Sequence, residues 1–418
     1  MDAIVGSARR YENTLVAILF FTWGTVFLDR MSQLYLAPYF APEFQLSRSQ
    51  IGTLASVLAI AWAASTFFFG ALSDRVGRRP VLIPAVFAFS ALSWISGLAH
   101  SYHQLLFIRV LMGIAEGPTW SIMTALIEES SPANRRGRNI GLVVSAAALV
   151  GLAAAPVLTT QVASRWGWRP AFFVAGIPGL LAGLLIWKYV KEPSASGETT
   201  HRKPSLREYV SILRYRNIWL CCVGATGFMS WLFALSVFAP LYLTEVAHQP
   251  ATTAGFLLGA SGLGSFFLGF LLPSLSDRLG RKPVLLLMAA LSAVVPLVFL
   301  VPALYVYPIL LAAIVFAANT GQGIASLVMV LVPTESVPPQ FRATSIGLTT
   351  LVGEVMGATG APLLAGALAE KHGLGLTMWL AAGGSAVLFC AGLFLREPSG
   401  GVDVPAILSP AGIATDSA

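Results

Sequence analysis

Charged side chains are scarce in this chain of 418 residues, because Asp, Glu, Lys and Arg together make up only 11% of it. Ordinary soluble domains carry about 25%, and a scarcity of this size excludes that class. Apolar residues are 56% of the sequence, and the mean hydropathy is +0.75. This balance indicates a chain that lies mostly within a lipid bilayer.

Cysteine is also rare, and the three that occur, Cys221, Cys222 and Cys390, all fall in apolar segments. They have neither the number of a disulfide framework nor the spacing of a metal site. The sequence also lacks a recognisable nucleophile or nucleotide motif, and GLGSFFLG (262–269) has no strand context for a dinucleotide loop. We therefore expect no enzyme, no metal and no cofactor.

Long apolar runs recur along the chain, and twelve of them have about the 20 residues that a helix needs to cross a bilayer. Each run predicts a membrane-spanning helix, and no stretch outside the runs could form a soluble domain. The predicted spans are 14–36, 52–72, 80–99, 105–126, 139–160, 170–190, 217–243, 252–275, 282–300, 304–330, 343–367 and 374–395.

Basic residues are distributed unevenly over the ends of these spans. Of the 26 Lys and Arg residues, 20 lie in the termini and in loops on the same side, and four lie in loops on the other side. Because Lys and Arg collect in cytoplasmic loops, we expect both termini in the cytoplasm and a multi-pass protein of the cell (inner or plasma) membrane. The same bias explains the net charge of +7, so we expect no nucleic-acid partner.

The chain contains an internal duplication. GALSDRVGRRP (70–80) recurs as PSLSDRLGRKP (273–283), ESSPANRRGRNIG (129–141) as ESVPPQFRATSIG (335–347), and KEP (191–193) as REP (396–398). The repeat of about 205 residues predicts two units of six spans. Their bounds are an N-terminus at 1–13, one bundle at 14–190, a polar cytoplasmic linker at 191–216, a second bundle at 217–395 and a disordered tail at 396–418.

The repeated stretches resemble a family signature. Gly70-x-x-x-Asp74-Arg75-x-Gly77-Arg78-Arg79 is similar to the loop between the second and third helices of the major facilitator superfamily, and 273–282 is a partial copy of it. The resemblance covers residues 12–398 and implies an all-α membrane protein with twelve transmembrane helices in two pseudo-symmetric six-helix bundles around a central site. It also implies a cytoplasmic gate, with pairing across the bundle interface, from Asp74, Arg75, Arg78, Asp277 and Arg278.

Four charged residues lie inside predicted spans: Asp29 and Arg30 in the first, and Arg109 and Glu116 in the fourth. Seven positions apart, Arg109 and Glu116 share a helix face at a separation of about 10 Å along the axis. Counted from the predicted span ends, Asp29 and Arg30 fall at a depth between them, so the four could form one electroneutral cluster. Charges persist in a bilayer where they pair or line a wet pathway; the alternatives are a transport site and a static ion-pair staple.

Asp29-Arg30 together with Arg109-x-x-x-Gly113-x-x-Glu116-Gly117 resembles the anion:cation symporters, which take up organic carboxylates with protons; WGWRPAFFVAGIPGL (166–180) is similar to that group as well. The resemblance implies that Asp29 and Glu116 are protonatable and that Arg30 and Arg109 contact the anion. Arginine binds carboxylate in bidentate fashion, and burial favours the neutral form of a carboxyl. Protonation of Asp29 or Glu116 would free an arginine for an arriving anion.

Other residues of the predicted spans complete the candidate substrate site: Trp62, Asn319, Gln322 and Glu354. Trp62 could stack on an aromatic acid, and helix–helix hydrogen bonds are the alternative role of Asn319 and Gln322. Glu354 stands where the symporter group often has a polar amide, and the sequence offers it no obvious cation. It could be a third proton site, a contact to a substrate ammonium or hydroxyl, or a neutral structural residue.

The sequence therefore predicts a secondary active transporter for proton-coupled uptake of an organic anion of carboxylate type. The alternative is a proton-driven exporter of the same fold, although GLAAAPVLTT (151–160) keeps only one Gly and the Pro of the exporter pattern G-x-x-x-G-P-x-x-G-G. The expected partners are a small-molecule organic anion, protons and the lipid bilayer, and the expected energy source is the proton gradient. A monomer is the default for this fold.

Overall fold

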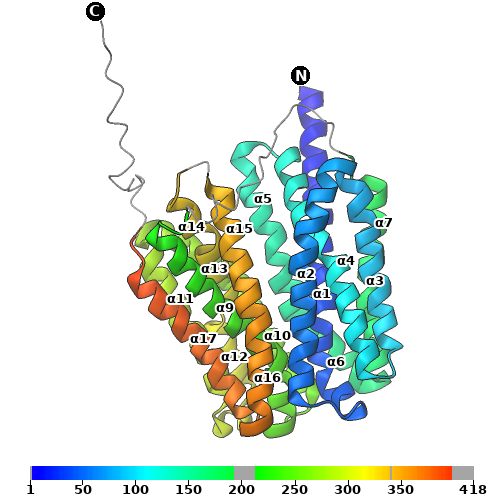
Figure 1. The fold of residues 1–418 in the computed structure, drawn as a ribbon, viewed down its shortest axis with the longest axis vertical. Helices are drawn as coiled ribbons and strands as arrows, with labels where there is room; N and C mark the ends of the chain where they lie inside the picture. Colours follow the sequence, from blue (N-terminus) through cyan, green and yellow to red (C-terminus); the bar gives the residue numbers. More distant parts are fainter. Residues whose placement is uncertain (1, 193–211, 339–340, 398–418) are drawn as a thin grey trace, which may run out of the picture.

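The computed structural model describes residues 2–192, 212–338 and 341–397 (Figure 1). Twelve helical spans in these residues are long and apolar enough to cross a membrane. This number and the all-α architecture confirm the fold class predicted from the sequence. The predicted linker at 191–216 and the predicted tail at 396–418 lie largely outside the described residues.

The first six spans run from the N-terminus to Tyr189. They are α1 (Asp2–Glu43), α2 (Arg48–Val76), α3 (Arg78–Gly97), α4 (Tyr102–Ser130), a fifth span made of α5 (Ala133–Ala146), the π-helix η1 (Ala147–Ala154) and α6 (Ala155–Trp166), and α7 (Trp168–Tyr189). Within this half, α2 packs on α4 and α3 packs on α7.

The second six spans begin at Arg216. They are α9 (Arg216–Leu241) with η2 (Tyr242–Val246), α10 (Ala251–Leu279), α11 (Arg281–Phe299), a tenth span of α12 (Pro308–Ala318), α13 (Gly321–Ala325), η4 (Ser326–Leu331) and α14 (Val332–Glu335), an eleventh span of α15 (Arg342–Val352), η6 (Gly353–Thr359) and α16 (Gly360–His372), and α17 (Gly375–Phe394). A short 3-10 helix, η3 (Pro302–Val306), precedes α12.

Helix boundaries follow local signals in the sequence. Ser47 and Gln50 form a capping box at the start of α2, and Ser101 accepts a hydrogen bond from the Gln104 N–H at the start of α4. Gly77 between α2 and α3 has φ 101°, and its counterpart Gly280 between α10 and α11 has φ 94°. Only glycine adopts such angles without strain, so these two positions make the same tight connection in both halves.

The first span is longer than predicted. We expected it to end at residue 36, before Pro38, but α1 continues through Pro38 and Pro42 to Glu43. Proline is tolerated in membrane helices because neighbouring groups satisfy the backbone that it leaves free. Asp29 is therefore 14 residues from the end of α1, and Glu116 is 14 residues from the start of α4 at Tyr102. Asp29 lies as deep as Glu116, and its predicted depth between Arg109 and Glu116 was wrong.

Apolar side chains cover the outside of the molecule as well as its interior. Phe89, Phe172, Phe238 and Phe299 are fully buried among the helices, whereas the outward-facing Phe68, Trp187, Ile309 and Trp379 are each more than half exposed. A helix that is apolar on all sides is typical of a bilayer setting. The surface therefore agrees with the membrane location that the sequence predicts.

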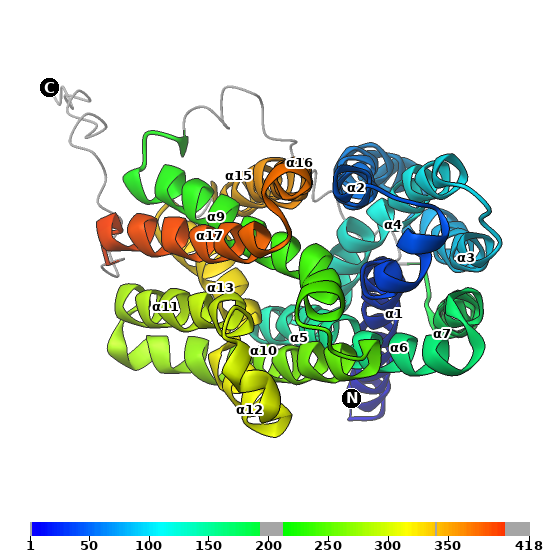
Figure 2. The same cartoon turned by 90° about the horizontal axis from the view of Figure 1, so that it is seen from below.

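The two halves meet along two seams, in which α2 packs on α16 and η6, and α6 and η1 pack on α10 (Figure 2). The start of α1 and the end of α17 lie at the same end of the helices, which we call the terminal side, and we call the opposite end the far side (Figure 1). Near the far side, a Cβ atom on Gly52 would clash with the Pro362 carbonyl oxygen, and one on Gly366 would lie 2.6 Å from the Arg48 carbonyl oxygen. Backbone therefore meets backbone there.

Polar contacts also join the two halves on the far side. The Arg48 guanidinium forms two hydrogen bonds to the Glu245 carboxylate, one of them 2.9 Å long. The Ser49 N–H donates to Oε2 of Glu370 at 3.2 Å. Among the described ion pairs, only Arg48–Glu245 and Arg30–Glu354 connect one half to the other. The structure is thus held together at the far side and in the middle.

Candidate functional site

Six charged side chains of the described residues are buried. Glu12 is one of them, and it pairs with Arg135 at 2.5 Å near the terminal side. The other five lie inside the membrane spans: Asp29, Arg30, Arg109, Glu116 and Glu354. The structure therefore collects in its interior the four charges that the sequence singled out, with Glu354 as a fifth.

Glycines explain how α4 carries two charges into the interior. A Cβ atom on Gly113 would lie 2.5 Å from the Leu58 carbonyl oxygen of α2, and one on Gly117 would lie 2.6 Å from Cβ of Ser65. The two glycines therefore let α4 approach α2 closely, and Ser65 Oγ donates to the Ile114 carbonyl oxygen at 2.5 Å across this contact. Helix packing therefore explains Gly113 and Gly117. It does not explain Arg109 and Glu116 of the same motif.

Arg109 and Glu116 have few partners of their own. Nη1 of Arg109 donates to the sulfur of Met112 at 3.3 Å. Within the part of the chain that the structure describes, Nε and Nη2 of Arg109 and both carboxylate oxygens of Glu116 have no hydrogen-bond partner. Buried polar groups normally have hydrogen-bond partners, so these atoms are candidates for hydrogen bonds to a small polar ligand.

Asp29 and Arg30, although adjacent in α1, have separate surroundings. Oδ1 of Asp29 accepts a hydrogen bond from Ser93 of α3 at 2.8 Å, while Oδ2 has no described partner. No described ion pair joins any two of Asp29, Arg30, Arg109 and Glu116. The expected cluster of four is therefore a group of neighbouring buried charges without direct pairing among themselves.

Arg30 faces the second half of the chain. Its Nη2 lies 3.6 Å from Oε2 of Glu354 in η6, and its guanidinium carbon lies 5.4 Å from the Trp62 ring centroid and 5.0 Å from that of Phe233 in α9. The sequence offered Glu354 no obvious cation, and that interpretation was wrong because the partner comes from the other half. The residue pattern within one span cannot reveal an ion pair with a residue of another span.

The remaining substrate candidates have different surroundings. Trp62 is buried beneath Arg30, and its indole Nε1 has no described partner. Asn319 lies in the break between α12 and α13, where its amide nitrogen donates to Ser261 Oγ at 2.7 Å and its amide oxygen accepts from the Gly321 N–H at 3.0 Å. The Gln322 backbone N–H donates to Ser265 Oγ at 2.9 Å. Asn319 thus serves the helix–helix contact that we held as its alternative role.

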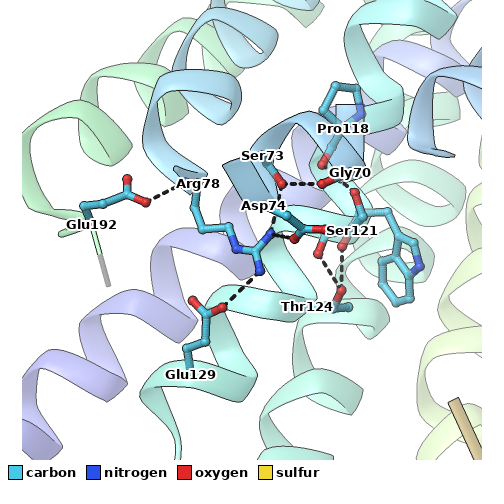
Figure 3. Close-up of polar contacts among 10 residues, drawn as sticks. Gly70, Ser73, Asp74, Arg78, Pro118, Ser121, Thr124, Glu129 and Glu192 are labelled. Atoms are coloured by element: carbon cyan, nitrogen blue, oxygen red, sulfur yellow. Dashed lines mark hydrogen bonds and ion pairs between the residues drawn. The ribbon is translucent and has the colours of Figure 1, made fainter. Parts of the chain in front are cut away.

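Two of the predicted gate residues, Asp74 and Arg78, lie in a compact polar network at the terminal side (Figure 3). Nη1 of Arg78 donates to Oδ1 of Asp74 and to Oγ of Ser73, at 2.6 and 2.9 Å, and Nη2 donates to Glu129 at 3.0 Å. The Glu192 carboxylate, at the end of the first half, accepts from the backbone N–H groups of Arg78 and Arg79 at 2.6 and 2.8 Å. All these contacts lie within the first half.

The second half repeats the network almost atom for atom. Arg281 donates to Asp277 and Ser276, at 2.6 Å each, and to Glu335 at 2.7 Å. Glu397 accepts from the backbone N–H groups of Arg281 and Lys282, the second at 3.0 Å. The expected pairing of Asp74 and Asp277 across the interface is absent from this structure, because each aspartate pairs with the arginine four residues later. Arg75 and Arg278 are exposed and have no described ion pair.

Sequence reasoning missed several members of these networks. Arg281 was left out, although it occupies the position of Arg78 in the repeat. Glu129 and Glu335 open the second repeated stretch, and Glu192 and Glu397 are the acids of KEP and REP. The internal repeat could have identified these residues, because each one recurs at the same position in both halves. It could not have shown which neighbour each glutamate contacts, since that depends on the packing of α3 and α11 against chain segments that are distant in sequence.

Asp74→Asn is expected to slow turnover while leaving the equilibrium affinity for substrate within a few-fold. The substitution removes one of the two carboxylates that pair with Arg78 at the terminal side, away from the buried charges inside the spans. Turnover would be measured as exchange in proteoliposomes, and affinity in detergent. Glu128→Gln removes an exposed carboxyl of the same side without a described ion pair, and serves as the control. Strongly weakened binding with normal conformational exchange would refute the gate role.

Comparison with known proteins gives a consistent result. The family model described as Major Facilitator Superfamily matches residues 19–361. The chain is 29% identical over 366 residues to a probable 4-methylmuconolactone transporter of Cupriavidus pinatubonensis, covering 85% of this chain and 83% of that protein. It is 28% identical over 410 residues to the cis,cis-muconate transport protein of Acinetobacter baylyi, covering 90% and 95%.

The fold is also similar to a solved structure. A crystal structure of a bacterial homologue of the human lysosomal transporter Spinster, in an inward-facing and unoccupied conformation, matches with a TM-score of 0.72 at 20% identity. The match covers 92% of this chain and 97% of that one. At this identity the likeness supports the fold alone.

Proposed function

Because the chain belongs to the Major Facilitator Superfamily, we propose that it is a secondary active transporter that carries an organic carboxylate together with protons by alternating access. The family and its relatives are transporters, which confirms the expectation that the chain is not an enzyme. It is a multi-pass membrane protein whose substrate is a small molecule. The identity of the anion as a carboxylate, the protons and the direction of transport are our proposal.

One observation carries the proposal: two buried arginines with unsatisfied donors lie within the membrane spans. Nε and Nη2 of Arg30 and of Arg109 have no hydrogen-bond partner among the described residues. Arginine stays charged even when it is buried, and its planar fork matches a carboxylate. The names of the two relatives, a probable 4-methylmuconolactone transporter and a cis,cis-muconate transport protein, support an organic-acid substrate.

The number of buried charges supports proton coupling. Three buried carboxyls, Asp29, Glu116 and Glu354, accompany two buried arginines within the spans. An unpaired buried charge is costly, so the empty site approaches neutrality when one carboxyl carries a proton. A bound monoanion adds another negative charge, and a further proton restores neutrality. Transport of anion and proton together follows from this balance.

The direction of transport and the membrane location complete the proposal. With both termini in the cytoplasm, as the basic residues predict, the far side faces away from the cytoplasm. The contacts Arg48–Glu245 and Gly52–Pro362 then close the site toward the outside, and the terminal side is the cytoplasmic one. We propose uptake across the cell membrane by a monomer.

An inwardly directed proton gradient is expected to drive uptake of organic anions by the purified protein in proteoliposomes. The panel would contain benzoate, gluconate, cis,cis-muconate and an aromatic sulfonate, each with and without the gradient. Accumulation above equilibrium of at least one carboxylate, abolished by a protonophore, would agree with the proposal. Uptake of none of them, or uptake independent of the gradient, would refute it. Protein-free liposomes give the control for passive entry.

A further inference from the structure

The ion pair between Arg30 and Glu354 has the features of an interaction that can break when another anion binds Arg30. Both side chains are nearly fully buried, with exposures of 4% and 8%, and they come from different halves of the chain. Their closest N···O distance is 3.6 Å, whereas a charge-assisted hydrogen bond is typically about 2.7–2.9 Å long. Oε2 of Glu354 and Nη2 of Arg30 therefore attract each other without a formed hydrogen bond.

Aromatic rings hold the Arg30 guanidinium in place. Its central carbon lies 5.8 Å from the Phe27 ring centroid, 5.4 Å from that of Trp62 and 5.0 Å from that of Phe233. Aromatic faces attract a cation but do not neutralise its charge. Glu354 is the only described carboxylate within ion-pair distance of Arg30, so it supplies the counter-charge in this structure.

Glu354 lies in a closely packed part of the second half. It lies in the π-helical turn η6, and such turns are frequent at functional sites. A Cβ atom on Gly357 in the same turn would lie 2.5 Å from Cβ of Met229 in α9, so η6 and α9 pack closely. Ser56 Oγ of α2 donates to the Thr359 carbonyl oxygen at 2.7 Å, across the seam between the halves. The place of Glu354 relative to Arg30 is therefore set by how the two halves pack.

We propose that Glu354 is an internal counter-anion, which occupies Arg30 in the empty transporter and is displaced by the carboxylate of the substrate. This inference rests on the proposed function, because it takes the substrate to be an organic anion. Glu354 then competes with substrate for Arg30 and at the same time allows the empty transporter to change conformation with Arg30 neutralised. It acts as a specificity-determining residue without contacting the bound anion.

Glu354→Gln is expected to bind an organic anion more tightly than wild type, by about tenfold or more, because coupling across close charge pairs has energies of that order. The variant should keep exchange of internal for external anion, since both directions then occur with Arg30 neutralised by substrate. Net uptake should fall strongly, because the empty transporter must return while Arg30 lacks its adjacent counter-charge. Affinity would be measured for benzoate, gluconate and cis,cis-muconate in detergent, and transport in proteoliposomes.

Two further variants make the result decisive. Glu354→Asp keeps the competing charge and should bind anions within about threefold of wild type, so it serves if Glu354→Gln is unstable without ligand. Glu43→Gln breaks the exposed pair with Arg169 inside the first half and should change neither affinity nor exchange. Weaker or unchanged anion binding in Glu354→Gln would overturn the proposal, since a direct substrate contact would weaken binding and a passive structural residue would leave it unaltered.

The failure of this inference can be distinguished from failure of the proposed function. If wild type binds none of the three anions, the proposed function fails, and with it the inference. If wild type binds one of them and Arg30→Lys weakens that binding, the anion site stands. Glu354→Gln then decides the role of Glu354 alone.

Discussion

Arg109→Lys is expected to weaken binding of the transported anion by about 1.5–3 kcal/mol, or roughly 10- to 150-fold in affinity. Lysine keeps the positive charge but loses the planar pair of donors, and in Arg109 these donors have no described partner other than the Met112 sulfur. Arg30→Lys provides the parallel test in α1, where the guanidinium lies among three aromatic rings. Substrate-induced thermal stabilisation of the detergent-purified protein gives the affinity.

The control for this prediction is Arg165→Lys, which changes an exposed arginine at the far side and should leave affinity unaltered. If the two arginines only form static ion pairs between helices, substitution by lysine should leave the affinity for the anion unaltered and should lower the melting temperature of the protein. If Arg109→Lys and Arg30→Lys both bind the anion as tightly as wild type, the two arginines do not form the anion site. Export of a neutral or cationic compound would then be the better hypothesis.

Asp29→Asn and Glu116→Gln are each expected to abolish accumulation driven by a proton gradient while preserving exchange of labelled for unlabelled anion. Asparagine and glutamine match the acids in shape, but they cannot take up or release a proton. Both carboxylate oxygens of Glu116 and Oδ2 of Asp29 have no hydrogen-bond partner among the described residues, so these oxygens are available for protonation. Accumulation and exchange would be compared in the same proteoliposomes.

Glu128→Gln, which removes an exposed carboxyl near the end of α4, is the control and should accumulate anion like wild type. Full gradient-driven accumulation in both Asp29→Asn and Glu116→Gln would assign coupling to other groups. Loss of exchange together with accumulation would mean that the carboxyls are needed for conformational change itself.

Much of the fold could be predicted because bilayer helices have a simple signal. A run of about 20 apolar residues fixes the existence of each span, and all twelve were found. Ends were less certain where a span contains proline, as at Pro38, since the energetic cost of proline depends on neighbours that the sequence does not place. The break at Asn319 was missed for a similar reason: the backbone N–H groups that it leaves free donate to side chains, that of Gly321 to the Asn319 amide oxygen and that of Gln322 to Ser265 Oγ.

The candidate site was predictable in composition but not in its pairing. Charges within a bilayer are rare, so Asp29, Arg30, Arg109 and Glu116 could be identified from their positions alone. The partner of Arg30 could not, because Glu354 lies more than 300 residues away and reaches it only through packing of the two halves. Likewise, the repeat aligned Glu192 with Glu397, but their contacts with the backbone N–H groups at the starts of α3 and α11 depend on where α7 and α17 end.

The glycine contacts on the far side affect whether water and ions can leak through the protein between its two halves. Gly52 faces the Pro362 carbonyl and Gly366 faces that of Arg48, at distances that leave no room even for a Cβ atom. A water molecule needs a space of about one 1.4 Å probe sphere and two to four polar partners, and such a contact offers no such space. A seal made of backbone surfaces blocks water and the ions that travel through it by shape alone. This kind of barrier does not weaken with salt or pH, so a gradient across the membrane is not dissipated at this contact while the transporter rests in the conformation described.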